Sequence, residues 1–249
     1  YMEKMIPKKI HLCWFGNGKM DETVQNCIKS WKEKLPDYEI KIWNEENFDI
    51  NISKYTKDAY KAEKWAFVSD YVRLWVLYNE GGIYLDSDVE IIKSLDELLY
   101  NKVFLGFENK YTICTAIIGA EKKNKYIKKL LNYYDKKDFY NKNGKMDLIP
   151  NTKTITDILK KEGLKKNGRN QVVKCDIHIY RQEYFSPKSY LTGEISTTNN
   201  TYAIHHFKGS WVKDDITTKV KKVILKIIGE DLYLFLANEK NRFADALKR

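Results

Sequence analysis

Residues 81–88 read Gly-Gly-Ile-Tyr-Leu-Asp-Ser-Asp. The two glycines are typical of a helix end, because glycine adopts positive φ without steric cost. The apolar residues 83–85 then predict a short buried strand. Side chains two residues apart in extended chain point the same way, so Asp86 and Asp88 should converge just after this strand. Such a carboxylate pair favours a bound Mg²⁺ or Mn²⁺, although an isolated Asp-x-Asp is also common as a solvated turn.

The segment before the glycines, residues 62–79, predicts a helix that is apolar around most of its circumference. Such a helix is normally buried. Asp70 and Arg73 nevertheless lie within it, three residues apart, where side chains occupy neighbouring parts of the helix surface. Charged side chains are rarely buried without partners, so the two either form a structural ion pair or face a polar site.

Together these two segments carry a family resemblance. Residues 66–73, Ala-Phe-Val-Ser-Asp-Tyr-Val-Arg, followed by residues 81–88, resemble the signature of glycosyltransferase family 32. That family includes capsular polysaccharide transferases and is related to the glucosylating domain of large clostridial toxins. The resemblance runs from Ile6 to about Trp211. It implies an α/β fold of the GT-A type, a Rossmann-like nucleotide-sugar-binding domain with a mixed sheet.

The resemblance also implies roles for four residues as the catalytic and donor-binding set. Asp88 would bind the metal directly, and Asp86 would contact it through water or hold the donor ribose. Asp70 and Arg73 would hold hydroxyls of the donor sugar. In related proteins the tryptophan after the first strand stacks on uracil, and Trp14 occupies the matching position. A core tryptophan is the competing interpretation of Trp14.

The order of the remaining elements indicates one domain over residues 1–249. Strand, helix and strand patterns over residues 6–16, 21–34 and 38–43 predict a βαβ unit. They open a nucleotide-binding half at about residues 1–110. By the same resemblance, a half that binds the acceptor and completes the metal site follows at about 111–215. Thr115 in this half is a candidate for the small polar residue that the family carries near the donor sugar. A helical tail is expected at 216–249.

A second chemical stretch lies at residues 202–211, Tyr-Ala-Ile-His-His-Phe-Lys-Gly-Ser-Trp. A histidine after a short strand can complete a metal site begun by two carboxylates. By resemblance, His206 is the favoured third ligand and His205 the second choice. Ser210 and Trp211 match residues that help to hold the donor diphosphate. His11, near the first strand, is expected to be structural.

Composition limits the alternatives. The chain has 249 residues, 43% of them hydrophobic, and a formal net charge of +10. This composition supports a sizeable core. The four cysteines are scattered, and three of them lie in apolar or amphipathic segments, which predicts buried, reduced thiols rather than disulfides or a zinc site. With no apparent signal peptide or spanning segment, we expect a cytoplasmic protein. The basic amphipathic stretch near residues 217–228 is compatible with peripheral contact with the inner face of a membrane, although such a helix more often packs its apolar face on the domain.

The leading hypothesis is therefore a retaining, metal-dependent hexosyltransferase. It would use Mn²⁺ or Mg²⁺ and a nucleoside diphosphate sugar, UDP-hexose being favoured over GDP-mannose. The acceptor would be a glycan or lipid-linked glycan in polysaccharide synthesis. One alternative is a haloacid-dehalogenase-type phosphatase that uses Asp86 as nucleophile and Asp88 as acid and base. The other is a basic nucleic-acid-binding protein, although the lysines are spread along the chain and no binding motif accompanies them.

Overall fold

The structure is a computed structural model that describes residues 5–208, 224–225 and 227–246. Seven strands form one sheet in the order β2-β1-β3-β6-β5-β8-β7, and β4 pairs with β9 in a second, two-stranded sheet. The strands are β1 (Lys9–Cys13), β2 (Glu39–Trp43), β3 (Gly82–Leu85), β4 (Val89–Ile91), β5 (Val103–Asn109), β6 (Thr112–Ala120), β7 (Gln171–Val173), β8 (Ile177–Tyr180) and β9 (Ala203–His205).

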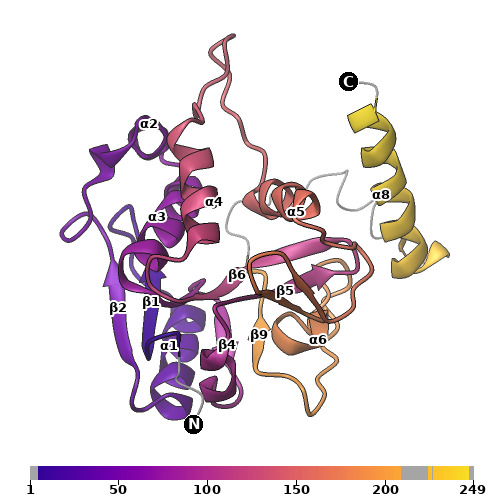
Figure 1. The fold of residues 1–249 in the computed structure, drawn as a ribbon, viewed down its shortest axis with the longest axis horizontal. Helices are drawn as coiled ribbons and strands as arrows, with labels where there is room; N and C mark the ends of the chain where they lie inside the picture. The colour runs from indigo at the N-terminus through magenta and orange to yellow at the C-terminus, as the bar shows by residue number, and fades with distance from the viewer. Residues whose placement is uncertain (1–4, 209–223, 226, 247–249) are drawn as a thin grey trace.

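Helices lie on both faces of the large sheet (Figure 1). The α-helices are α1 (Glu22–Lys34), α2 (Lys54–Lys61), α3 (Trp65–Glu80), α4 (Lys125–Asp135), α5 (Asn151–Lys161), α6 (Gln182–Phe185) and α8 (Glu230–Ala246), and the 3₁₀ helices are η1 (Ile50–Ile52) and η2 (Asp96–Tyr100). One hydrophobic core lies among α2, α3, α4 and α5, and the other lies beneath α1, η2 and α6. The α/β class with two covered sheet faces is therefore confirmed.

The strand directions place the carboxyl ends of β1 and β3 at one edge of the large sheet. β1 runs parallel to β2 and to β3, so β1, α1 and β2 form the predicted βαβ unit. β3 pairs antiparallel with β6, which makes the sheet mixed as expected. β5 pairs antiparallel with β6 and parallel with β8. Trp14 directly follows β1 and Asp86 directly follows β3, so both residues lie at this edge of the sheet.

Local signals set the boundaries of the helices next to the site. The carboxylate of Asp21 accepts the backbone N–H of Val24 at 3.2 Å and caps α1. Gly81 ends α3 with a φ of 70° and donates its N–H to Leu77. α3 begins at Trp65 rather than at the predicted residue 62. The separate helix α2 precedes it and was not identified in the sequence analysis.

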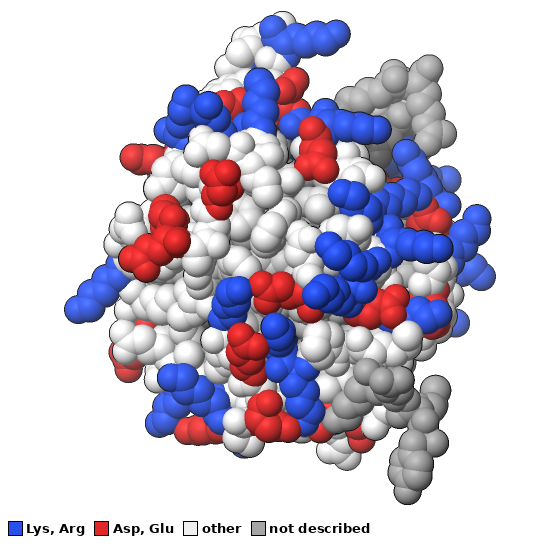
Figure 2. Space-filling model, turned by 60° about the vertical axis from the view of Figure 1, so that its left-hand side comes forward, with Lys and Arg blue, Asp and Glu red and all other residues white. Residues whose placement is uncertain are grey.

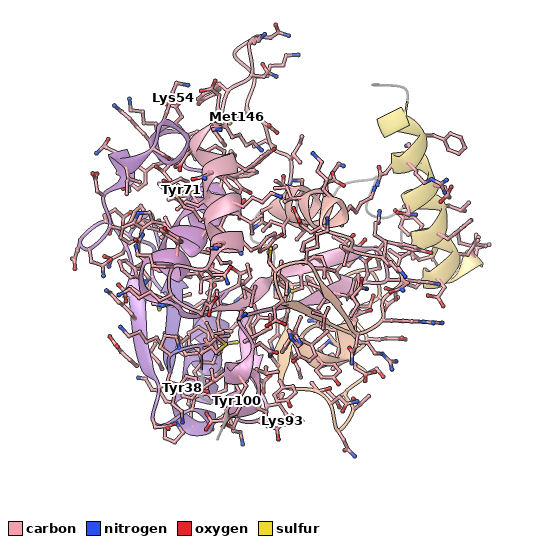
Figure 3. The ribbon with its side chains drawn as sticks, viewed as in Figure 1. Tyr38, Lys54, Tyr71, Lys93, Tyr100 and Met146 are labelled. Carbon is pink, nitrogen blue, oxygen red and sulfur yellow. The ribbon has the colours of Figure 1, made fainter. Side chains whose placement is uncertain are left out.

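Several outlying features complete the architecture. Residues 136–150 project from the body of the protein between α4 and α5 (Figure 1). Figure 3 shows Lys54 and Met146 at this end, and Tyr38, Lys93 and Tyr100 at the opposite end. All four cysteines are free, and three of them are buried, as predicted. In the described part of the chain, no helix has both the length and the apolarity that crossing a bilayer requires. The basic stretch at 217–228 lies largely outside the described residues.

The contact between β5 and β6 gives a stability prediction. A Cβ at Gly119 of β6 would overlap the ring of Phe104, which is fully buried. Gly119→Ala should therefore lower the free energy of unfolding by about 1–3 kcal/mol through overpacking, measured by urea denaturation. Gly18→Ala is the control, because a Cβ there meets no atom within 4 Å. Equal stability of the two variants would contradict this packing.

Candidate metal and donor-sugar site

The two carboxylates of residues 86–88 lie on a turn that leaves β3. Asp86 donates its N–H to the carbonyl of Ala116 at 2.8 Å, and Val89 donates to the carbonyl of Asp86 at 3.1 Å. This turn joins β3 of the large sheet to β4 of the small one. It presents Asp86 and Asp88 at the junction of the two sheets, on a framework of buried strands.

His205 is the third member of this group. β9 pairs antiparallel with β4, and this pairing sets His205 opposite Val89, next to Asp88. The Nε2 atom of His205 lies 3.4 Å from Oδ1 of Asp88. Asp86, Asp88 and His205 each offer one ligand atom, and these atoms all lie within 4.8 Å of one another. The structure therefore brings the Asp-x-Asp pair together with a histidine.

The histidine is His205 rather than the favoured His206. The Nε2 atom of His206 lies 2.9 Å from Oε2 of Glu90. It lines a separate hollow of about 350 Å³ with Thr23, Asn26, Cys27 and Glu90. Among the described residues, His206 belongs to no cluster with Asp86 or Asp88. Successive residues of a strand point to opposite faces, which separates the two histidines.

Asp88 and His205 shift the pKa of each other in opposite directions. Burial opposes the charged form of Asp88, but His205 and the backbone N–H of Lys208, which donates at 2.8 Å, outweigh it and lower the pKa of Asp88. Burial likewise opposes the charged imidazolium, yet the adjacent Asp88 and Cys114 side chains raise the pKa of His205 well above its ordinary value. The Nδ1 atom of His205 is buried and has no hydrogen-bond partner. A cation bound here would take the place of the imidazolium proton.

Arg73 connects the buried helix α3 to the acidic turn. Its guanidinium lies 3.1 Å from Oδ1 of Asp70 and 3.4 Å from Oδ1 of Asp86. It also donates to the backbone carbonyl of Thr115 at 2.7 Å. Asp70 and Arg73 therefore form the ion pair that the sequence left open as one alternative, and they do so in direct contact with the Asp-x-Asp motif.

Two neighbours of this cluster were missed by the sequence analysis. Tyr84 of β3 donates its hydroxyl to Oδ1 of Asp86 at 2.7 Å, and its ring lies 4.4 Å from the guanidinium carbon of Arg73. Strand alternation could have found it, because Tyr84 and Asp86 are two residues apart. Asn151 at the start of α5 accepts a hydrogen bond from the hydroxyl of Thr115 at 2.8 Å. Asn151 gives no signal in the sequence.

The remaining predicted residues have mixed outcomes. Trp14 follows β1 and is half-buried outside both hydrophobic cores, with its indole N–H donating to the carbonyl of Gly18 at 2.6 Å. Stacking of Trp14 on a base stays a prediction. His11 is fully buried, accepts from the indole of Trp43 and contacts the carbonyl of Gly81, so it is structural. Ser210 and Trp211 lie outside the described residues.

Comparison with known proteins places this geometry in a family. Residues 21–105 match the family described as "Glycosyltransferase sugar-binding region containing DXD motif". This match supports the resemblance drawn above, and it covers the segment that carries Asp70, Arg73, Asp86 and Asp88. It also favours the transferase over a phosphatase or a nucleic-acid-binding protein. Figure 2 agrees, because acidic and basic side chains are interspersed on the face that it shows.

Curated relatives match about half of the chain. The chain is 31% identical over 162 residues to "Subversion of eukaryotic traffic protein A" of Legionella pneumophila, covering 51% of this chain and 25% of that protein. It is 30% identical over 130 residues to "Inositol phosphoceramide mannosyltransferase 3" of Schizosaccharomyces pombe, covering 49% of this chain and 35% of that protein. The chain thus spans a quarter to a third of the length of these relatives.

A solved structure is also similar. It is a glycosyltransferase involved in the glycosylation of the major capsid of PBCV-1, with a TM-score of 0.49 and 10% identity. The match covers 88% of this chain and all of that one.

Glu108 of β5 adjoins the site and was also missed by the sequence analysis. Its carboxylate forms a second cluster with Cys114 and His205. Burial raises the pKa of Glu108 from its ordinary value of 4.5 to about 7. Between these values the folded protein keeps a proton that the unfolded chain has lost. The resulting stabilisation is complete below pH 4.5 and is lost as the pH rises through about 7.

In the metal-free protein, Glu108 should therefore contribute a loss of stability as the pH rises from about 4.5 to 7. Glu108→Gln should flatten this part of the profile, because its side chain does not titrate. Urea denaturation across that pH range, in the presence of a chelator, measures the slope. Glu194→Gln, at an exposed position, is the control and should keep the wild-type slope. An unchanged slope in Glu108→Gln would show that this carboxyl is not the cause.

Proposed function

We propose that the protein is a retaining, metal-dependent hexosyltransferase that moves a sugar from a nucleoside diphosphate to a hydroxyl group of a glycan or lipid-linked glycan. The observation that carries the proposal is the cluster of Asp86, Asp88 and His205, whose two carboxylates lie within the segment that matches the glycosyltransferase sugar-binding region. One relative is named inositol phosphoceramide mannosyltransferase 3, and this name supports hexosyl transfer to a glycolipid. Retention of configuration rests on the resemblance to family 32.

The residues of the cluster suit a divalent cation of the Mn²⁺ type. Two carboxylates and an imidazole are the hard and intermediate ligands that such ions accept. Asp88 and His205 are largely buried, each with a side chain 13% exposed, so their charges are poorly compensated by solvent. The cation would hold the donor diphosphate and offset the negative charge that develops as this group leaves.

The surrounding residues would orient the donor. The hydroxyl of Tyr84 and the guanidinium of Arg73 both contact Oδ1 of Asp86 and fix the direction of that carboxylate. Asp70, on the other side of Arg73, can accept a hydrogen bond from a sugar hydroxyl. Trp14, at the end of the neighbouring strand β1, would offer its ring to the base, and stacking on an aromatic ring contributes about 1–3 kcal/mol per base. UDP is favoured as the nucleotide by the resemblance.

Thermal unfolding with a panel of nucleoside diphosphate sugars, each with and without Mn²⁺, tests the proposal. A ligand that binds only the native state stabilises it by about 2.7 kcal/mol at one hundred times its dissociation constant. We expect one sugar nucleotide to raise the melting temperature only when Mn²⁺ is present, and Asp88→Asn to lose this response. No response to any member of the panel, or an undiminished response in Asp88→Asn, would refute the proposed site.

The two adjacent histidines give a matched pair of variants. His205→Ala should lower the affinity for Mn²⁺ by at least about tenfold, because it removes a ligand next to Asp88. His206→Ala removes only the partner of Glu90 and should leave the Mn²⁺ affinity close to that of the wild type. Calorimetric titration with Mn²⁺ measures both. The reverse ranking would restore His206 as the ligand.

A further inference from the structure

A second group of metal-binding side chains adjoins the first and shares His205 with it. Glu108, Cys114 and His205 each offer one ligand atom, and these atoms all lie within 4.8 Å of one another. They come from three different strands, β5, β6 and β9. The role proposed above for the Asp-x-Asp motif uses neither Glu108 nor Cys114.

The pairing of β5 with β6 brings Glu108 and Cys114 together. Cys114 pairs directly with Gly106, which has no side chain to separate it from its neighbours. The register shifts between Phe107 and Asn109, so Glu108 is the extra residue of a β-bulge. Bulges redirect side chains and are frequent next to active sites. Here the bulge places a partly buried carboxylate beside a thiol and an imidazole.

The chemistry of the three side chains distinguishes this group from ordinary core packing. A buried cysteine usually acts as a small apolar residue. Cys114, however, is fully buried and accepts a hydrogen bond from the hydroxyl of Ser186 at 3.2 Å, which orients the sulfur. The buried Nδ1 atom of His205 makes no hydrogen bond. A buried polar atom without a partner is costly, and a metal ion is one way to satisfy it.

We propose that Glu108, Cys114 and His205 form a binding site for Zn²⁺. A thiolate, an imidazole and a carboxylate are the ligands that zinc prefers, whereas Mn²⁺ and Mg²⁺ favour oxygen ligands. The hydrogen bond from Ser186 is the kind of outer contact that orients a metal ligand. On binding, the thiol of Cys114 releases its proton to solvent and its sulfur coordinates the metal.

Sharing His205 has a consequence for the neighbouring site. A neutral imidazole has one nitrogen free to bind a metal, so His205 that coordinates zinc cannot also bind a metal held by Asp86 and Asp88. Zn²⁺ therefore opposes the binding of Mn²⁺ at the Asp-x-Asp motif and inhibits transfer. This consequence rests on the proposed function, whereas the binding of zinc does not.

Cobalt substitution tests the site directly, because Co²⁺ bound to a thiolate shows a sulfur-to-metal charge-transfer absorption that oxygen and nitrogen ligands do not give. The full chain is titrated with Co²⁺ in a Cys175→Ser background, since that exposed thiol lies next to Asp176 and would contribute absorption of its own. We expect the absorption to appear, to disappear in Cys114→Ser, and to be displaced by Zn²⁺. Cys27→Ser, at another buried cysteine, is the matched control and should retain it.

Two further variants keep the test decisive. Asp88→Asn should retain the absorption, because Asp88 belongs only to the Asp-x-Asp group. Glu108→Gln should weaken Zn²⁺ binding at least tenfold, and it replaces Cys114→Ser if that variant does not fold. Absence of the absorption from the parent protein, or its persistence in Cys114→Ser, would overturn the proposal. If the absorption is present but no nucleotide sugar binds with Mn²⁺, the zinc site stands and the proposed transferase function fails.

Discussion

The buried guanidinium of Arg73 is the interaction on which the site depends. It contacts a carboxylate of the helix α3, a carboxylate of the acidic turn and the backbone carbonyl of Thr115 in β6. Burial raises the pKa of Asp70 to about 7 despite this partner. In the absence of metal, Arg73 lies between Asp70 and Asp86, and the imidazolium of His205 lies against Asp88. In the proposed function, a divalent cation would take the place of the imidazolium proton beside these carboxylates.

The packing of α3 against the sheet holds these charged side chains in place. α3 packs against β1, β3 and β6, so the strand that ends at Asp86 and the helix that carries Arg73 belong to one packed unit. The small sheet then adds His205 through the pairing of β9 with β4. Residues far apart in the chain thus converge because two sheets meet at a single turn.

The sequence predicts the local part of this arrangement well. Asp70, Arg73, Asp86 and Asp88 all lie within one helix, turn and strand, and short-range patterns are enough to relate them. The choice between His205 and His206 depends on the register of β9 against β4. It also depends on the turn at Phe207, whose φ of 53° lies in the left-handed region and whose ring packs on His205. Neither feature leaves a pattern in the sequence.

Glu108 shows the same limit, because its position depends on a β-bulge between two strands of the large sheet. Its neighbours in the chain suggest an ordinary apolar strand, Val103–Asn109. Only the pairing with β6 shows that the extra residue directs a carboxylate toward Cys114 and His205. A site assembled from several strands is therefore recognised from the strand pairing in the structure and not from the local sequence pattern.

The most direct measurement is the anomalous scattering of Mn²⁺ in crystals of the protein soaked with the metal and a nucleoside diphosphate. The account predicts a single strong peak between the carboxylate of Asp88 and Nε2 of His205, in contact with the diphosphate. A peak between His206 and Glu90, or none near residues 86–88, would contradict it.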